Sequence, residues 1–250
     1  MPTITLHNSL SLRCTVLLFT LAFSTAVAQE SGLIGLYGNI NLPYKEFREA
    51  VDNPIGGTAV GFDLQLLFNP KGKQSYSPVY PGIDFTYVTF GRDFIDGTPT
   101  TPPLKTTFNY YAINALFRLM PFQKQKGFIP FIDGALGLEI YNTRTKIDKN
   151  ALDIVLNDSQ PEVIHTTNDT GLVRTLAVGW FIRRPSKANP DQPGGSFTLR
   201  IGYSYGSPID YVKRGSVAVD NGFVTYEEGR TRAQMILIQL GLNLPFTSVE

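Results

Sequence analysis

Apolar residues alternate with small or polar ones along several stretches of this chain, and this alternation limits the folds that it can adopt. In one stretch, Phe197, Leu199 and Ile201 lie on one side, while Thr198 and Arg200 lie on the other. A period of two residues is typical of a β-strand with two different faces. The pattern predicts strands at residues 33–42, 58–68, 82–92, 106–119, 129–141, 171–183, 196–206 and 231–244.

The composition of the two faces indicates which one points outward. Charged residues make up 17% of the chain, against roughly 25% in an average soluble domain. Opposite the bulky face, the strands carry Gly, Ala, Ser and Thr with isolated charges, which suits a crowded interior better than a surface in water. The bulky faces must then meet lipid, where only helices and closed barrels satisfy every backbone group.

We therefore expect an all-β fold, an eight-stranded antiparallel up-and-down transmembrane β-barrel. The stretches match the ~9–11 residues that a transmembrane strand requires. The alternative is a soluble barrel of the lipocalin kind, which would turn the bulky faces inward around an apolar ligand. In the membrane barrel, the side chains expected to face lipid are Phe62, Leu64, Leu66, Leu136, Leu138, Val178, Trp180, Ile201, Ile236, Ile238, Leu240 and Leu242.

Aromatic residues fall near both ends of the predicted strands, as in the two aromatic girdles of outer-membrane barrels. If both chain ends are periplasmic, the girdle at that side contains Phe68, Phe117, Trp180, Phe197 and Phe246. The opposite girdle contains Tyr87, Tyr111, Tyr203 and Tyr205. The outer loops would then cover residues 43–57, with a short amphipathic helix at 44–51 packed on the rim, 93–105, 142–170 and 207–230.

The first 28 residues have a different character. Arg13 precedes an apolar run at 15–23, and small residues ending in Ala26-Val27-Ala28 follow. This order is typical of a cleaved secretory signal peptide. We expect residues 1–28 to be removed and residues 29–250 to form one outer-membrane β-barrel domain.

The eight strands, the signal peptide and the last strand together resemble a known group. The last strand ends Gly241-Leu242-Asn243-Leu244-Pro245-Phe246, and the chain continues with Thr247-Ser248-Val249-Glu250. The pattern resembles the small bacterial outer-membrane β-barrel proteins of the OmpA and OmpX type, including porT-like members, over the whole chain after residue 28. The resemblance implies location in the bacterial outer membrane, contact with outer-membrane lipid and insertion by the barrel-assembly machinery.

Several charged residues fall on the small-residue faces and would point into the barrel. A buried charge is costly unless it is paired, and an eight-stranded barrel is just wide enough for side chains to fill it. We expect Arg118 and Arg200 to pair with the aspartates in the periplasmic half of the lumen and to plug it. The predicted lumen charge network consists of Asp63, Asp84, Arg118, Asp133, Glu139 and Arg200.

The sequence offers little for catalysis or for a cofactor. His165 is the one histidine after residue 28, in the third outer loop, and Ser159 and Ser204 are taken as ordinary serines. We therefore expect no enzyme activity, no catalytic residues, no cofactor and no metal site. The third loop is interpreted as a solvated acidic loop rather than a calcium site, and its acids are Asp148, Asp153, Asp158, Glu162 and Asp169.

The function predicted from these observations is non-catalytic. We expect a barrel with a plugged lumen that has a structural role or binds an unknown extracellular ligand or protein through its loops. The alternative is a narrow pore, or a barrel associated with secretion or transport. A net charge of +1 gives no reason to expect binding to nucleic acid.

Overall fold

A computed structural model describes most of the chain after residue 30. Within this part, no helix is both long enough and apolar enough to cross a membrane. The signal peptide predicted at residues 1–28 lies outside the described residues. The structure describes residues 31–51, 58–71, 77–97, 102–121, 127–148, 163–185, 193–220 and 223–247.

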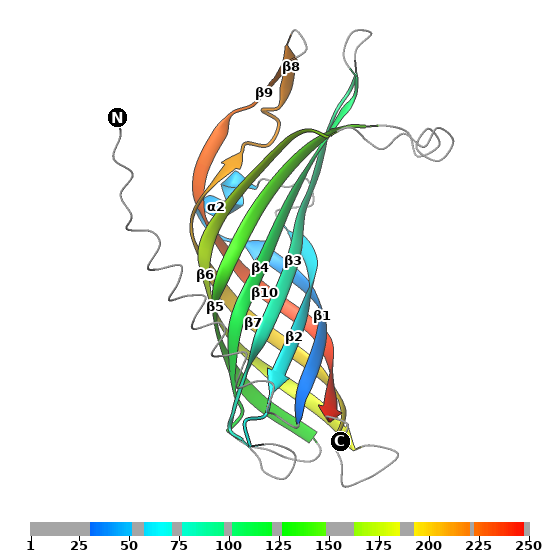
Figure 1. The fold of residues 1–250 in the computed structure, drawn as a ribbon, viewed down its shortest axis with the longest axis vertical. Coiled ribbons are helices and arrows are strands. Elements are labelled where there is room, and N and C mark those ends of the chain that lie inside the picture. The colour runs from blue at the N-terminus through cyan, green and yellow to red at the C-terminus, as the bar shows by residue number, and fades with distance from the viewer. Residues whose placement is uncertain are drawn as a thin grey trace, which may run out of the picture.

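The strands form one closed antiparallel barrel in which each strand pairs with its neighbour in the chain (Figure 1). The first and last strands complete the ring, with Ser31 opposite Thr247 and Pro43 opposite Met235. This topology confirms the predicted eight-stranded up-and-down barrel. Its strands are β1 (Ser31–Pro43), β2 (Ala59–Phe68), β3 (Val79–Ile95), β4 (Leu104–Leu119), β5 (Gly127–Ile147), β6 (Val163–Pro185), β7 (Pro193–Val212) and β10 (Glu228–Thr247).

Several strands extend further at their outer ends than the sequence predicts. β5 reaches Ile147 rather than residue 141, and β6 begins at Val163 rather than at residue 171. In this region, polar residues such as Asn142 and Thr143 occupy both faces, so the alternation disappears although the strands stay paired. The outer ends of β4, β5 and β6 rise beyond the closed part of the barrel (Figure 1).

The first outer loop contains the short helix that the sequence predicts. This helix, α2 (Glu46–Ala50), packs against β10 and β1 at the outer end of the barrel. Phe47 enters the outer mouth of the barrel, where its ring lies 5.4 Å from that of Phe90 and 6.3 Å from that of Tyr141. The aromatic surface inside the mouth therefore holds the helix at this end of the barrel through Phe47. The fourth loop adds a small hairpin of β8 (Ala218–Asp220) and β9 (Phe223–Thr225).

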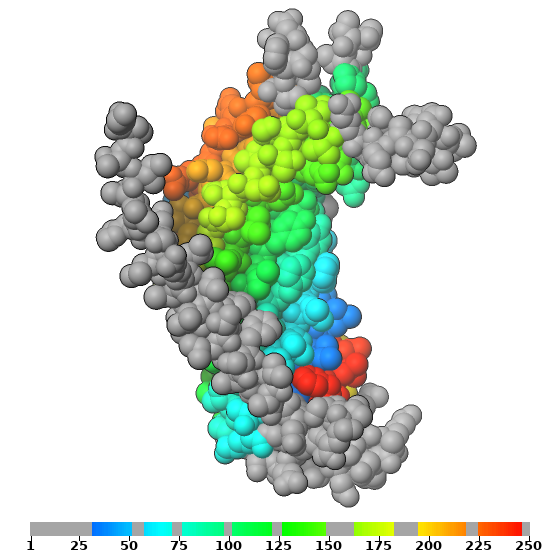
Figure 2. All heavy atoms as spheres, viewed as in Figure 1, coloured from blue at the N-terminus to red at the C-terminus, as the bar shows by residue number. Residues whose placement is uncertain are grey.

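The exterior of the barrel is apolar and its interior is polar in the middle. Leu138, Leu176 and Leu242 are 59%, 66% and 58% exposed, whereas Asp63 and Arg118 are fully buried. Each side chain that the sequence assigned to lipid is exposed or half-buried on the outer face. The space-filling view shows the strands packed side by side as an elongated wall (Figure 2). The outside is therefore built to contact lipid and the inside is not built around an apolar ligand.

Aromatic pairs lie at both ends of the apolar band. At the end where β1 starts and β10 finishes, Phe68 and Phe246 are 6.3 Å apart, measured between ring centroids. Towards the other end, the rings of Tyr87 and Tyr111 are 5.2 Å apart. Two such levels of aromatic rings bracket the hydrocarbon zone of outer-membrane barrels.

Replacing an apolar residue in the middle of this band with arginine should destabilise the barrel. On the outer face of β6, Val178 lies between Trp180 of the girdle near the periplasm and Leu176, which is opposite Tyr203 of the outer aromatic level. We expect Val178→Arg to lower the free energy of unfolding by about 2–4 kcal/mol, because the charge enters hydrocarbon. Thr170→Arg, on the same face but beyond the band, should cost about 0–1 kcal/mol. Urea titration in lipid vesicles measures both, and equal losses would contradict the assigned position of the band.

Candidate functional site

The lumen is filled in layers along the barrel axis. An apolar cluster fills the end where β1 begins and β10 ends, and a larger one fills the outer end below α2. A polar layer lies between them. The sequence analysis expected mainly small residues inside, but both clusters contain large inward aromatic side chains. These include Tyr80, Phe90, Phe108, Tyr110, Phe131, Tyr141 and Phe181.

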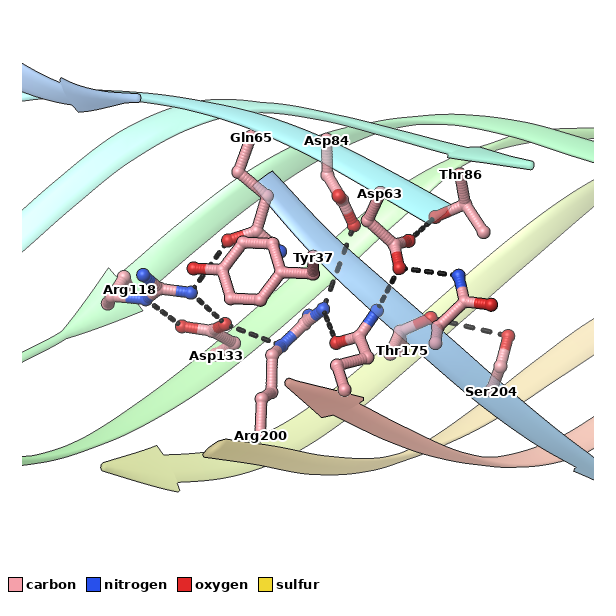
Figure 3. A network of polar contacts seen from close by, with 12 residues as sticks. Tyr37, Asp63, Gln65, Asp84, Thr86, Arg118, Asp133, Thr175, Arg200 and Ser204 are labelled. Atoms are coloured by element: carbon pink, nitrogen blue, oxygen red, sulfur yellow. Dashed lines mark hydrogen bonds and ion pairs between the residues drawn. The ribbon is translucent and has the colours of Figure 1, made fainter. Parts of the chain in front are cut away.

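Two arginines share one aspartate at the centre of the polar layer. Arg118 Nε and Nη2 each donate to Asp133 across 2.7 Å, and Arg200 Nε lies 2.8 Å from Asp133 Oδ2. All three side chains are at most 1% exposed. They reach across the lumen from β4, β5 and β7, as Figure 3 shows. One carboxylate therefore joins two buried cations, which is the compensation that buried charges require.

The other aspartates of the network are placed differently. Asp84 Oδ2 lies 3.9 Å from Arg200 Nη1, at the limit of an ion pair. Asp63 forms no ion pair among the described residues, contrary to the expectation that it pairs with an arginine. It accepts hydrogen bonds of 2.6 Å from Asn39 and from Gln239. The amides replace the guanidinium because they satisfy the same oxygens from the neighbouring strands.

Hydrogen bonds continue the network across the barrel (Figure 3). Gln239 accepts from Arg200 at 2.6 Å, and Gln65 accepts from Arg118 at 2.9 Å. On the other side, Asn41 donates to Asn39 at 2.7 Å. The chain of contacts therefore runs without a break from Arg118 to the first strand. These contacts join side chains from several strands and restrict how each of them can move.

The small residue Gly179 on β6 leaves space for the Phe131 ring beside this layer. A Cβ atom added at Gly179 would lie 2.3 Å from Cζ of Phe131, so no larger residue fits there without movement. The Phe131 ring in turn lies 4.0 Å from the Arg118 guanidinium, and the Phe181 ring lies 5.2 Å from it. The two rings therefore support Arg118 from the apolar layer by cation–π contact.

Glu139 lies apart from the network, further along β5. It is fully buried, and no described residue pairs with it as a cation. It leans over Gly206 of β7, where an added Cβ would lie 2.2 Å from Oε1. The sequence places Glu139 in the lumen correctly, but it does not join the charge network with Arg118 and Arg200.

A second arginine site at the outer mouth escaped the sequence analysis. Arg214, in the fourth outer loop, forms a 2.7 Å ion pair with Asp93 and donates to the Phe90 carbonyl at 2.9 Å. Its guanidinium also lies 4.5 Å from the ring of Phe108. Arg214 and Asp93 are far apart in the chain, so no local pattern could have revealed the pair.

Of the residues considered for catalysis, the structure describes His165 and Ser204, which lie on the regular strands β6 and β7. His165 lies on β6 rather than in a loop, where Nε2 is 2.8 Å from Thr167 Oγ1 and the ring stacks on Tyr226 at 4.4 Å. Gly202-Tyr203-Ser204-Tyr205-Gly206 matches the G-x-S-x-G pattern, which the sequence analysis overlooked. That pattern serves as a nucleophile elbow only on a sharp strand-to-helix turn. Here it lies in the regular strand β7, with Ser204 buried and bonded by Thr175 at 3.3 Å.

The acidic third loop is only partly described. Asp169 belongs to β6, where it accepts a hydrogen bond from the backbone of Asp210 at 2.5 Å, and Asp148 directly follows β5. Asp153, Asp158 and Glu162 lie outside the described residues, and so does Ser159. Among the described side chains, no three His, Cys, Asp or Glu residues are grouped as metal ligands would be.

Comparison with solved structures returns small outer-membrane barrels. Ail of Yersinia pestis, in complex with the heparin analogue sucrose octasulfate, has a TM-score of 0.45 and 10% identity, over 87% of this chain and 99% of that one. The Neisserial surface protein NspA has a TM-score of 0.43 and 12% identity, over 88% and 100%. OprG of Pseudomonas aeruginosa has a TM-score of 0.42 and 12% identity, over 88% and 97%. No protein-family model and no curated protein matches the sequence.

At these sequence identities and TM-scores, the solved structures carry no argument about this chain, and its architecture follows from its own structure. The closed ring of consecutive antiparallel strands, the apolar exterior and the two levels of aromatic rings give this chain the architecture of the small outer-membrane β-barrels. The fold and the type of barrel agree with the resemblance found in the sequence.

Removing the charge of Asp133 should destabilise the barrel strongly. Asp133→Asn leaves Arg118 without a carboxylate partner and Arg200 with Asp84 alone, at 3.9 Å, and we expect a loss of about 3–5 kcal/mol in the free energy of unfolding. Asp84→Asn should cost clearly less, because its nearest guanidinium nitrogen is 3.9 Å away. Urea titration followed by the fluorescence of Trp180, the one tryptophan, measures both. A larger loss for Asp84→Asn would refute the central position of Asp133.

Proposed function

We propose that this protein is a non-catalytic barrel of the bacterial outer membrane with a sealed lumen, which acts through the surface that its outer end presents. The observation that carries the proposal is the buried Arg118–Asp133–Arg200 arrangement between two apolar layers. An ion or solute crossing the lumen would have to break this arrangement and pass both layers. A wide, water-filled channel needs the opposite design, with hydrated charges around an open path.

The outer mouth supports a role in binding. A cavity of about 510 Å³ opens there and is lined by Glu49, Asp93, Tyr211, Lys213 and Arg214, among others. Its lining also includes Ala50, a member of the apolar cluster that contains Phe47, and Tyr211 packs against this cluster. Charged residues from α2 and the fourth loop therefore surround a concave surface on a rigid support, which is where binding residues are expected in such a fold.

A narrow cation pathway is the second candidate. Three aspartates face two guanidinium groups in the polar layer, so the layer contains one carboxyl group more than it has arginines. The unbonded oxygen Oδ1 of Asp84 lies in this layer. A cation could use this excess only if the apolar layers above and below opened, and this is why the sealed barrel is the preferred function.

Recording of single channels in planar bilayers separates the two candidates. We expect the folded protein to show no steady conductance, because the lumen is blocked at the polar layer and at both apolar layers. A stable, cation-selective conductance that falls in Asp84→Asn would overturn the sealed barrel and support the pathway. Correct folding is checked beforehand by heat-modifiable migration on a gel.

The orientation of the barrel can be tested by labelling cysteines in intact cells. Asp96 follows β3 at the outer end, and Pro70 follows β2 at the opposite end. In a Cys14→Ser background, we expect a membrane-impermeant maleimide to label Asp96→Cys and not Pro70→Cys. After the outer membrane is permeabilised, both should react. Labelling of Pro70→Cys alone in intact cells would reverse the orientation, and labelling of neither would contradict the surface role.

A further inference from the structure

Two exposed arginines share one tyrosine ring on the outer face of the barrel. The guanidinium carbon of Arg174 lies 5.7 Å from the centre of the Tyr205 ring, and that of Arg232 lies 5.6 Å from it. Arg232 also donates a hydrogen bond from Nη1 to the Tyr205 hydroxyl. The three residues come from β6, β7 and β10, which are neighbours in the barrel. The ring therefore holds two cations next to each other on the wall.

The pair lies at the border of the apolar band. Arg174 stands on the outer face of β6 between Leu172 and Leu176, which are 58% and 66% exposed. A charge in hydrocarbon is costly, and long basic side chains in such places extend their heads to the polar headgroups. Tyr203, which is the outward-facing residue of β7 next to Tyr205, belongs to the outer level of aromatic rings. The guanidinium groups are thus at the level of the lipid headgroups, with acyl chains directly beneath.

The two cations have no counter-charge on the protein. No described carboxylate oxygen lies within 4.0 Å of Arg174 or Arg232. By contrast, Arg230, the next outward-facing residue on β10, has Asp210 at 3.6 Å. Two uncompensated guanidinium groups side by side repel each other, and an anion that carries two negative charges would relieve this repulsion.

We propose that Arg174 and Arg232, held on Tyr205, bind a phosphate group on the headgroup of an outer-leaflet lipid. Planar guanidinium groups match the oxygens of a phosphate and bind it with charge-assisted hydrogen bonds. A free phosphate ion would meet leucine side chains below the site, whereas a phosphorylated lipid places its acyl chains against them. The proposal rests on the proposed membrane location. It names a ligand class for a surface on the outside of the barrel, which takes no part in sealing the lumen.

Nearby residues extend the same surface. The Lys45 ammonium lies 5.5 Å from the ring of Tyr44, and that ring contacts Tyr203 with 6.4 Å between centroids. Tyr203 donates to Gln234 at 2.9 Å, and Gln234 is opposite Tyr205 in the sheet. A lipid with a second phosphate would therefore find a further cation along the same level of the wall.

Lipid binding by the purified full-length protein tests the proposal. Native mass spectrometry in a non-ionic maltoside detergent counts the bound lipids for lipid A with both phosphates and for lipid A from which the phosphates were removed. We expect the phosphorylated lipid to bind at least tenfold more tightly. Equal binding of the two lipids would overturn the proposal, and so would loss of the lipid complex at millimolar inorganic phosphate, because the site would then select the free ion.

Matched variants locate the site. Arg174→Gln and Arg232→Gln should each weaken binding of the phosphorylated lipid about tenfold, since each removes one charge-assisted contact. Arg230→Gln makes the same change on the same strand at a compensated arginine, and its binding should remain unchanged. Tyr205→Leu should weaken binding by removing the ring, whereas Tyr205→Phe should retain most of it. If Arg230→Gln and Arg232→Gln lost the same amount of affinity for the phosphorylated lipid, general attraction by positive charge would explain the binding, and the proposed site would be overturned.

A separate measurement distinguishes failure of this proposal from failure of the proposed function. Flotation with liposomes reports whether each variant enters a membrane, and heat-modifiable migration reports whether the barrel is folded. Folded, inserted protein without a preference for the phosphorylated lipid refutes the lipid site alone. Failure of the unmodified protein to insert would refute the membrane location, and this proposal with it.

Discussion

Hydrocarbon cannot satisfy a free backbone N–H or C=O group, and the whole architecture follows from this constraint. The sheet has to close, so β1 pairs with β10 along its entire length, from Ser31 to Pro43. Closure then separates the two faces of each strand completely. The outer face has to be apolar for the lipid, and the inner face has to fill a narrow space without leaving charges unpaired.

Among the described residues, the lumen fills its narrow space without unpaired arginines by placing aromatic side chains and the ion-paired residues in different layers. Large aromatic side chains occupy both ends, and the Arg118–Asp133–Arg200 arrangement lies in a layer between them. Within that layer Asp133 is the pivot, because two guanidinium groups depend on it, while amides such as Gln239 extend the bonding to Asp63. Sealing therefore comes from packing and from ionic compensation together, and neither alone would fill the section of the barrel.

The alternation of residues was enough to predict the fold, because each strand that crosses lipid must show it. It also placed Arg118, Asp133 and Arg200 on inner faces, from which their meeting could be expected. The strand ends could not be predicted, since both faces of β5 and β6 become polar beyond the band. Pairings such as Arg214 with Asp93, or Asp63 with Asn39 and Gln239, depend on the register of distant strands, which no local pattern encodes.

The strands extend beyond the apolar band at their outer ends, and this extension determines how far from the membrane the outer loops lie. On β6, residues 163–171 continue beyond the exposed Leu172 as paired strand. At ~3.3 Å per residue and a tilt near 40°, these residues carry the wall roughly 20 Å above the apolar band. A hydrogen-bonded sheet is stiff over that distance, so the strands hold the loops at a fixed height above the apolar band. A partner would thus be met above the lipid sugars and headgroups rather than among them.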